Sequence, residues 1–231
     1  MSPRQQLILQ AIVEIYAKTA EPVGSAALVQ QFDASGATIR AEMVELEHGG
    51  YIMQPHISAG RVPTDKGYRA YVNVLVPQKG DERTEMALAK TVMGAGEADR
   101  AIKNAVESLA HLTRNLGLAT IGGNLYLSGM AGLFQHPEFL GGDKTYEVAR
   151  LLDSLEEWLA EAAPNEPISV YIGKENPIGR ASGATLIISR FVSPYSDRSY
   201  IGVLGPTRQQ YGPVIGLVEY TGRLLQDTLN K

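Results

Sequence analysis

Hydrophobic residues at helical spacing predict three helices at the start of the chain. Ser2 is expected to cap the first helix, where Gln5 completes a capping box, and Ser25 and Ser35 are expected to cap the second and third helices. The side of the third helix expected to pack inward carries Ile39, Met43 and Leu46. The opposite side carries Ala37, Ala41, Val44 and His48. The third helix is therefore predicted to rest on a core and to leave its second side uncovered.

A β-hairpin and a fourth helix are predicted to follow. Residues 51–54 are typical of a strand, residues 58–60 of a turn, and residues 61–62 of the returning strand. Pro55 and Pro63 favour an edge hairpin, and Thr64 can cap the helix that comes next. Three helices, a hairpin and a fourth helix in this order predict a winged helix-turn-helix domain.

The polar run 77–81 is interpreted as a domain boundary, although a simple turn between helices fits it as well. Helical sequence resumes near residue 83, pauses at residues 94–96 and then continues with a regular apolar stripe. The stripe consists of Ile102, Val106, Leu109, Leu112 and Leu116. This spacing fits either a core helix or a dimer interface, for which Ile102, Leu109, Leu112 and Leu116 are the candidates. An exposed face of the sheet expected in the second domain is the alternative dimer surface.

Short apolar segments separated by Gly, Pro and Asn dominate the sequence after residue 117. Strands are expected at residues 125–127, 168–172, 184–192 and 200–204. One helix is expected to carry Val148, Leu155 and Leu159, and a last helix to begin at Pro206. The expected organisation is a domain at residues 1–76, a linker with a long helical segment at 77–117, and an α+β domain at 118–231.

Composition excludes several classes of site. The 231 residues include no cysteine, so disulfides and thiolate sites are ruled out. The histidines at positions 48, 56, 111 and 136 lack the spacing of a metal site, and no catalytic set can be nominated. The sequence shows no apolar run long enough for a membrane span, and we expect neither a span nor a leader peptide. The expectation is a cytoplasmic protein that is not an enzyme and needs no metal or cofactor.

Charge is the main objection to a DNA-binding role. The formal net charge is −4, whereas nucleic-acid-binding domains are commonly basic. The first 75 residues alone carry six Lys or Arg against seven Asp or Glu. DNA binding would therefore depend on where a few cations lie, and we expect modest affinity from one copy.

Several stretches together resemble the HrcA family of bacterial heat-inducible transcription repressors. They are RQQLIL (4–9), EPVGS (21–25), ATIR (37–40), QPH (54–56), SAGRVPTDKGYR (58–69), PEF (137–139), IGKEN (172–176) and IGVLGPTR (201–208). The resemblance implies a homodimer with a winged-helix domain and a GAF-like α+β domain. It also implies binding to CIRCE, an inverted-repeat operator in double-stranded DNA upstream of chaperone genes, and regulation by the chaperonin GroEL.

The chain departs from this family in two ways. The inserted dimerisation region and part of the GAF-like sheet are expected to be missing near residues 118–124, so the second domain is a reduced one. In addition, Gly36, Ala41 and Ala26 stand where the family often has Ser, Asn and Arg. The alternative function is therefore a GAF-like module for a ligand or a protein partner, with a winged helix that binds DNA only weakly.

Candidate DNA contacts follow from the third helix and the hairpin. Arg40 can reach a guanine or a phosphate, and the alanines can meet a thymine methyl. Arg61, expected at the hairpin tip, can enter the minor groove. An ordinary helix with solvated charges and an ordinary hairpin are the structural alternatives. The full set of candidates is Ser35, Ala37, Thr38, Arg40, Ala41, His56, Ser58, Gly60, Arg61, Lys66 and Arg69.

Overall fold

The structure is a computed structural model that describes residues 1–162, 164–176, 180 and 182–230. The chain forms two compact units. Unit 1 comprises Met1–Val76 with Arg208–Tyr211, and unit 2 comprises Pro77–Thr207 with Gly212–Lys231. Helices and strands occur in both units, so the prediction of a mixed α+β protein is confirmed.

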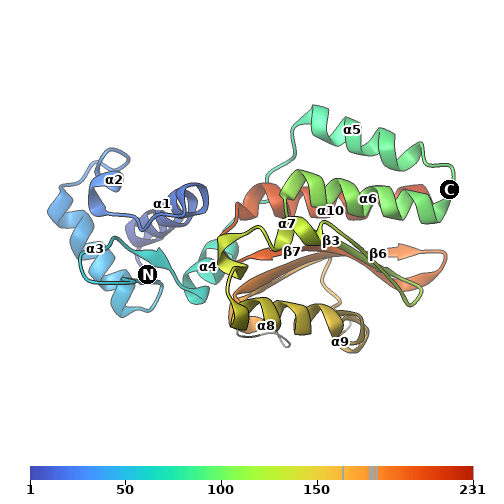
Figure 1. The fold of residues 1–231 in the computed structure, drawn as a ribbon. Coiled ribbons are helices and arrows are strands. Elements are labelled where there is room, and N and C mark those ends of the chain that lie inside the picture. The colour runs from blue at the N-terminus through green and yellow to red at the C-terminus, as the bar shows by residue number, and fades with distance from the viewer. Residues whose placement is uncertain (163, 177–179, 181, 231) are drawn as a thin grey trace. The chain divides into compact units, whose positions relative to one another are not determined.

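Unit 1 consists of helices and one small hairpin (Figure 1). Its elements are α1 (Pro3–Thr19), α2 (Ser25–Val29), α3 (Gly36–His48), β1 (Ile52–Met53), β2 (Val62–Pro63) and α4 (Asp65–Val72). The two strands are antiparallel, with Ile52 opposite Pro63. Helices and hairpin occur in the order that the hydrophobic pattern predicts.

Local side-chain caps define where these helices begin. Ser2 and Gln5 form the expected capping box, and the hydroxyl oxygen of Ser35 accepts a hydrogen bond from the backbone N–H of Thr38 at 3.1 Å. Thr64 caps α4 in the same way. Ser25 was expected to cap α2, which is wrong: it is the first residue of that helix, and Gly24 occupies the cap without a side-chain bond.

The core of unit 1 gathers residues from each of its helices. Fully buried side chains include Ile8, Ile12, Leu28, Ile39, Leu46 and Ile52. Tyr211 also belongs to this unit and is fully buried, with its ring centroid 5.6 Å from that of Tyr68 and 6.4 Å from that of Tyr71. Such aromatic pairs contribute stability beyond their buried area.

Unit 2 is built on an antiparallel sheet with strand order β4-β3-β7-β6-β5. Its strands are β3 (Leu116–Ile121), β4 (Asn124–Ser128), β5 (Ile168–Ile172), β6 (Ala184–Ser193) and β7 (Ser196–Pro206). Its helices are α5 (Glu82–Met93), α6 (Ala98–Thr113), α7 (Met130–Leu133), η1 (Pro137–Phe139), α8 (Gly142–Asp153), α9 (Leu155–Ala162), η2 (Gly173–Glu175) and α10 (Tyr211–Leu229). Helices α6 and α10 cover one face of the sheet, and α8 and α9 cover the other (Figure 1).

Several predicted boundaries in unit 2 are wrong. The helix expected across residues 148–159 is interrupted at Ser154, and the last helix begins at Tyr211, because Pro206 still belongs to β7. Strand β3 was not predicted. The segment 77–117 is also no linker, since α5, α6 and the first residues of β3 are part of unit 2.

The apolar stripe proposed as a dimer interface lies mostly inside unit 2, so the prediction that it forms an interface is wrong. Ile102 is 2% exposed and Leu109 is fully buried, and Leu116 is a fully buried residue of β3 rather than of the helix. Only Leu112, at 43% exposed, is available at the surface. The stripe is therefore a core stripe. Helices lie on both faces of the sheet (Figure 1), but the edge strand β4 keeps exposed residues such as Leu127, at 38%, so a dimer surface on the sheet stays a prediction.

Across the described residues, none of the helices combines the length and the apolar character needed to cross a membrane.

Candidate nucleic-acid interface

Helix α3 has one buried side and one exposed side, as the sequence predicts. Ile39 is fully buried and Met43 is 5% exposed, whereas Ala37, Arg40 and Ala41 are exposed. Val44 is 40% exposed and extends this side by one turn. We call Ala37, Arg40, Ala41 and Val44 the exposed face of α3. Its side chains are short and mostly apolar, with Arg40 as the cationic member.

The polar candidates on α3 already have partners in the protein. The Ser35 hydroxyl caps the helix and lies 2.9 Å from the hydroxyl of Thr38. The Nε of Arg40 donates to the carbonyl oxygen of Gly36 at 3.1 Å, which folds this side chain back along its own helix. Ser35 and Thr38 therefore build the start of the helix, while Arg40 remains exposed.

The tip of the hairpin consists of residues 55–58, which precede the turn that the sequence suggested. Pro55, His56, Ile57 and Ser58 are exposed, and Ile57, at 93%, is the most exposed large hydrophobic residue in the part of the chain that the structure describes. Ser58 has φ of 69°, in the left-handed region, and this reverses the chain. An almost uncovered isoleucine at a hairpin tip has no role in the core of unit 1.

Arg61 lies at the base of the hairpin, so its expected position at the tip is wrong. Its Nε and Nη2 atoms each lie 2.9 Å from Oε2 of Glu47, and its side chain is only 18% exposed. Its backbone N–H and carbonyl exchange hydrogen bonds of 2.9 Å with Val23. The guanidinium is therefore held against α3.

Gly60 and Lys66 have structural roles that the sequence did not suggest. A Cβ atom on Gly60 would lie 2.5 Å from the carbonyl carbon of Val23, so the close approach of two backbone segments requires glycine there. Lys66 donates to the carbonyl oxygen of Gly49 at 2.7 Å and lies 4.5 Å from the ring centroid of Tyr51. These contacts fasten α4 to the end of α3. Arg69 is half-buried in α4, and a DNA contact for it stays a prediction.

The acidic residues of α3 differ in their surroundings. Glu42 lies 3.9 Å from Arg4 of α1, and Glu47 is paired with Arg61. Glu45 is 64% exposed and lies 3.9 Å from His48, an ion pair only when the histidine is protonated. Glu45 follows Ala37 and Ala41 at four-residue spacing, so it lies beside the exposed face.

Two residues of this surface were missed from the sequence, Glu47 and Ile57. A signal existed for Glu47, because it follows the buried Met43 by four residues and therefore borders the inward side of the helix. The exposure of Ile57 follows from the position of the turn, which the sequence placed three residues too late.

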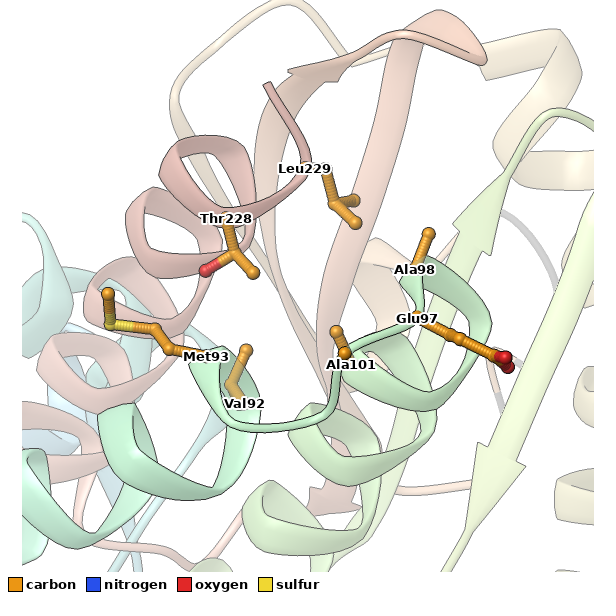
Figure 2. Close-up of a pocket in the computed structure, with 8 residues that line it drawn as sticks. Val92, Met93, Glu97, Ala98, Ala101, Thr228 and Leu229 are labelled. Carbon is orange, nitrogen blue, oxygen red and sulfur yellow. The ribbon is translucent and has the colours of Figure 1, made fainter. Parts of the chain in front are cut away.

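Cavities of different sizes occur in unit 2. One of about 220 Å³ lies between the α5–α6 turn and the end of α10, below the usual volume of ligand pockets. Figure 2 shows apolar side chains such as Val92 and Leu229 around it, while the Glu97 carboxylate points away from them. Another, of about 480 Å³, is lined by Ala110, His111, Arg114, Gly132, Gln135 and His136. Within the described part of the chain, His, Asp and Glu do not form a group of three that could hold a metal ion.

Comparison with known proteins shows what this chain is similar to. The heat-inducible transcription repressor HrcA of Thermobifida fusca is 47% identical over 121 residues, which cover 51% of this chain and 35% of that protein. The matched part thus spans about a third of that relative. The repressor of the same name from Desulforudis audaxviator is 28% identical over 337 residues, covering 99% of this chain and 98% of that protein.

The second alignment confirms that this chain is short. It runs over 337 positions while the chain has 231 residues, so about a hundred positions of the relative have no counterpart here. A solved structure described as "Crystal structure of a hypothetical protein at 2.2 A resolution" matches with a TM-score of 0.85 at 18% identity, covering 99% of this chain and 98% of the other. This likeness shows a shared fold.

The family model described as HrcA protein C terminal domain matches residues 73–215. The relatives with this family name are transcription repressors, in agreement with the prediction that the chain is not an enzyme. Since the model covers more than half of the chain, and named relatives align with nearly all of it, the chain belongs to the HrcA family.

Proposed function

We propose that this chain is a sequence-specific DNA-binding transcription repressor of heat-shock genes, with unit 1 as a winged helix-turn-helix domain and unit 2 as a reduced GAF-like domain. The observation that carries the proposal is the surface of unit 1. The exposed face of α3 stands uncovered, and the hairpin joined to α3 through Glu47 presents an uncovered tip. Membership of a family whose members are named heat-inducible transcription repressors supports this reading.

The exposed face of α3 suits the major groove. An α-helix fits this groove, where alanine methyls such as those of Ala37 and Ala41 can meet a thymine methyl. Arg40 can release its bond to Gly36 and donate to a guanine or a phosphate. The small side chains let the helix backbone come close to the bases. Specificity is therefore expected to come from shape and apolar contact more than from many hydrogen bonds.

The hairpin tip suits the adjacent minor groove. Apolar side chains, isoleucine among them, act as wedges between base steps in proteins that bind there. Ile57 is exposed for this role, and His56 and Ser58 beside it can contact phosphates. The tip residues thus replace Arg61 as the minor-groove contacts of the proposal.

An inverted repeat of the CIRCE type is the operator that we propose, bound by a homodimer. Two α3 helices would enter successive major grooves about 34–36 Å apart, and two copies double the contacts of a weakly charged unit. Sedimentation at micromolar concentration measures the dimer directly. Regulation by GroEL stays a prediction from the family resemblance.

The decisive experiment is a mobility shift with a CIRCE-type inverted repeat and a scrambled duplex over a salt series. Specific binding that weakens as salt rises is expected, and Arg40→Ala should reduce it. Arg150→Ala is the matched control, because it removes an exposed arginine of α8 in unit 2. Equal binding to both duplexes, or none, contradicts the proposed function.

The alternative function is a GAF-like module for a ligand or protein partner. The cavity of about 480 Å³ favours it, because this volume lies within the range of small-molecule sites and His111, Arg114 and His136 suit an anion. The same mobility shift separates the two functions. Absence of specific DNA binding, together with a calorimetric signal for small carboxylates that His111→Ala abolishes, would support the alternative.

A further inference from the structure

One carboxylate of α3 holds both arms of the hairpin. Oε1 of Glu47 accepts the backbone N–H of Gln54 at 3.1 Å, and Oε2 accepts the Nε and Nη2 groups of Arg61 at 2.9 Å each. Gln54 follows the first strand and Arg61 precedes the second. Glu47 therefore bonds to the hairpin at the two points where its loop begins and ends.

The hairpin needs such an anchor because its strands are very short. Each strand has two residues, and residues 54–61 between them form no ladder. An isolated two-stranded hairpin is marginally stable even when it is longer. Within the loop, Gln54 and Arg61 both donate to the carbonyl oxygen of Ala59, at 3.0 and 3.5 Å. Both residues that contact Glu47 thus also set the shape of the loop leading to the tip.

The pair between Glu47 and Arg61 is partly shielded from water. The side chains are 30% and 18% exposed, and charge-assisted bonds in such surroundings are stronger than those between fully exposed groups. An Arg61 that turned toward DNA would leave the Glu47 carboxylate without its cation next to a polyanion. The geometry thus favours an Arg61 that stays on Glu47 when DNA binds.

We propose that Glu47 is the positioning residue of the hairpin and that Arg61 acts on DNA binding through Glu47, without contacting DNA itself. This inference rests on the proposed function. Glu47 and Arg61 together fix the angle between the hairpin tip and α3. The tip itself makes the contact with the groove.

The test compares two carboxylates of the same helix. Glu47→Ala and Glu45→Ala each remove one negative charge from α3, and electrostatics alone predicts that both tighten DNA binding. If Glu47 positions the hairpin, Glu47→Ala weakens binding to the inverted repeat by about tenfold, the scale of one lost charge-assisted contact, while Glu45→Ala does not weaken it. Tighter binding by both variants overturns the proposal.

A double-variant cycle then separates positioning from direct contact. Arg61→Ala is expected to weaken binding as much as Glu47→Ala, and the combined variant no more than either, because the two residues act as one unit. The slope of log affinity against log salt should stay unchanged, whereas loss of a phosphate contact lowers it by about one. Additive losses with a reduced slope for Arg61→Ala would overturn the proposal.

Two measurements without DNA keep the outcomes distinct. Urea unfolding identifies variants in which the whole of unit 1 is unfolded. As a further comparison, Glu47→Gln, which keeps an acceptor for Gln54, should bind DNA better than Glu47→Ala. Amide hydrogen exchange at Gln54 should be faster in Glu47→Ala than in Glu45→Ala, because only the former loses its acceptor. Unchanged exchange at Gln54 refutes the anchoring whatever DNA does. If exchange at Gln54 responds to Glu47→Ala as expected but the unaltered chain binds no DNA specifically, the proposed function is refuted. The role of Glu47 in DNA binding is then refuted with it.

Discussion

Replacing Leu109 by alanine tests whether the stripe of α6 is core or interface. Leu109 is fully buried within unit 2, and the change removes three carbon atoms. Lost transfer free energy amounts to about 0.8 kcal/mol per carbon, or about 2.4 kcal/mol. The remaining cavity adds to this, so we expect the free energy of unfolding to fall by about 3–4 kcal/mol, within the range for buried leucines. Leu112→Ala is the matched control, because Leu112 lies on the same helix at 43% exposed and should cost about 1 kcal/mol or less.

Urea unfolding at two protein concentrations, followed by circular dichroism, measures both variants. A core role for Leu109 predicts a large fall in the midpoint of the unit 2 transition that is the same at both concentrations. Sedimentation should show an unchanged association state for Leu109→Ala. The reasoning fails if Leu109→Ala costs no more than Leu112→Ala, or if it dissociates a dimer while the stability of unit 2 is retained.

Three further outcomes are expected from unit 1. Glu45→Gln should strengthen binding to scrambled DNA in a salt series, because it removes an exposed charge beside α3; weaker binding would mean that Glu45 accepts from a base. Gly60→Ala should destabilise unit 1 by about 1–3 kcal/mol in thermal unfolding, because a Cβ atom meets the backbone of Val23. Gly24→Ala is the control, because its Cβ meets no atom within 4 Å and it should cost only the smaller loss of glycine at the cap of α2. Burial, the nearby Glu14 carboxylate and its hydrogen bond raise the pKa of Tyr71 from 10.0 to about 12. The contribution of neutral Tyr71 to the free energy of unfolding is therefore complete below pH 10 and is lost as the pH rises to 12. Tyr71→Phe should remove that part of the loss in urea titrations, and an unchanged pH dependence would contradict this.

Local chemistry explains what the sequence predicted well. The caps at Ser2, Ser35 and Thr64 depend on bonds to residues three positions away, so the sequence alone contains the whole interaction. The buried and exposed sides of α3 follow from helical periodicity in the same way, since Ile39 and Ala41 lie on opposite sides by geometry. These features needed no knowledge of distant partners.

Distant partners explain what the sequence did not predict. The stripe through Leu109 has the same spacing whether it packs on its own sheet or on a second copy, and only the sheet decides between them. Strand β3 is buried along all its residues, so it shows none of the alternation that marks a half-exposed strand. Arg61 lies 14 positions from Glu47, and the register that pairs Met53 with Val62 fixes where it falls. Pairing at this distance leaves no periodic signal.

The same pairing answers the objection raised by charge. The first 75 residues are slightly acidic by count, but Glu42 faces Arg4 and Glu47 holds Arg61, so two of the three acids of α3 are balanced within the protein. Arg61 is unavailable to phosphates because it is bound to Glu47 at 2.9 Å, whereas Arg4 is 56% exposed and lies 3.9 Å from Glu42. Glu45 remains as the exposed acid of the helix, opposed on the same surface by Arg40. A surface this close to neutral draws little of its affinity from counterion release. Specificity must then come from shape, from the uncovered Ile57 and from the use of two copies. The orientation of the small hairpin, and the Glu47 carboxylate that sets it, should therefore matter more here than in a strongly basic domain.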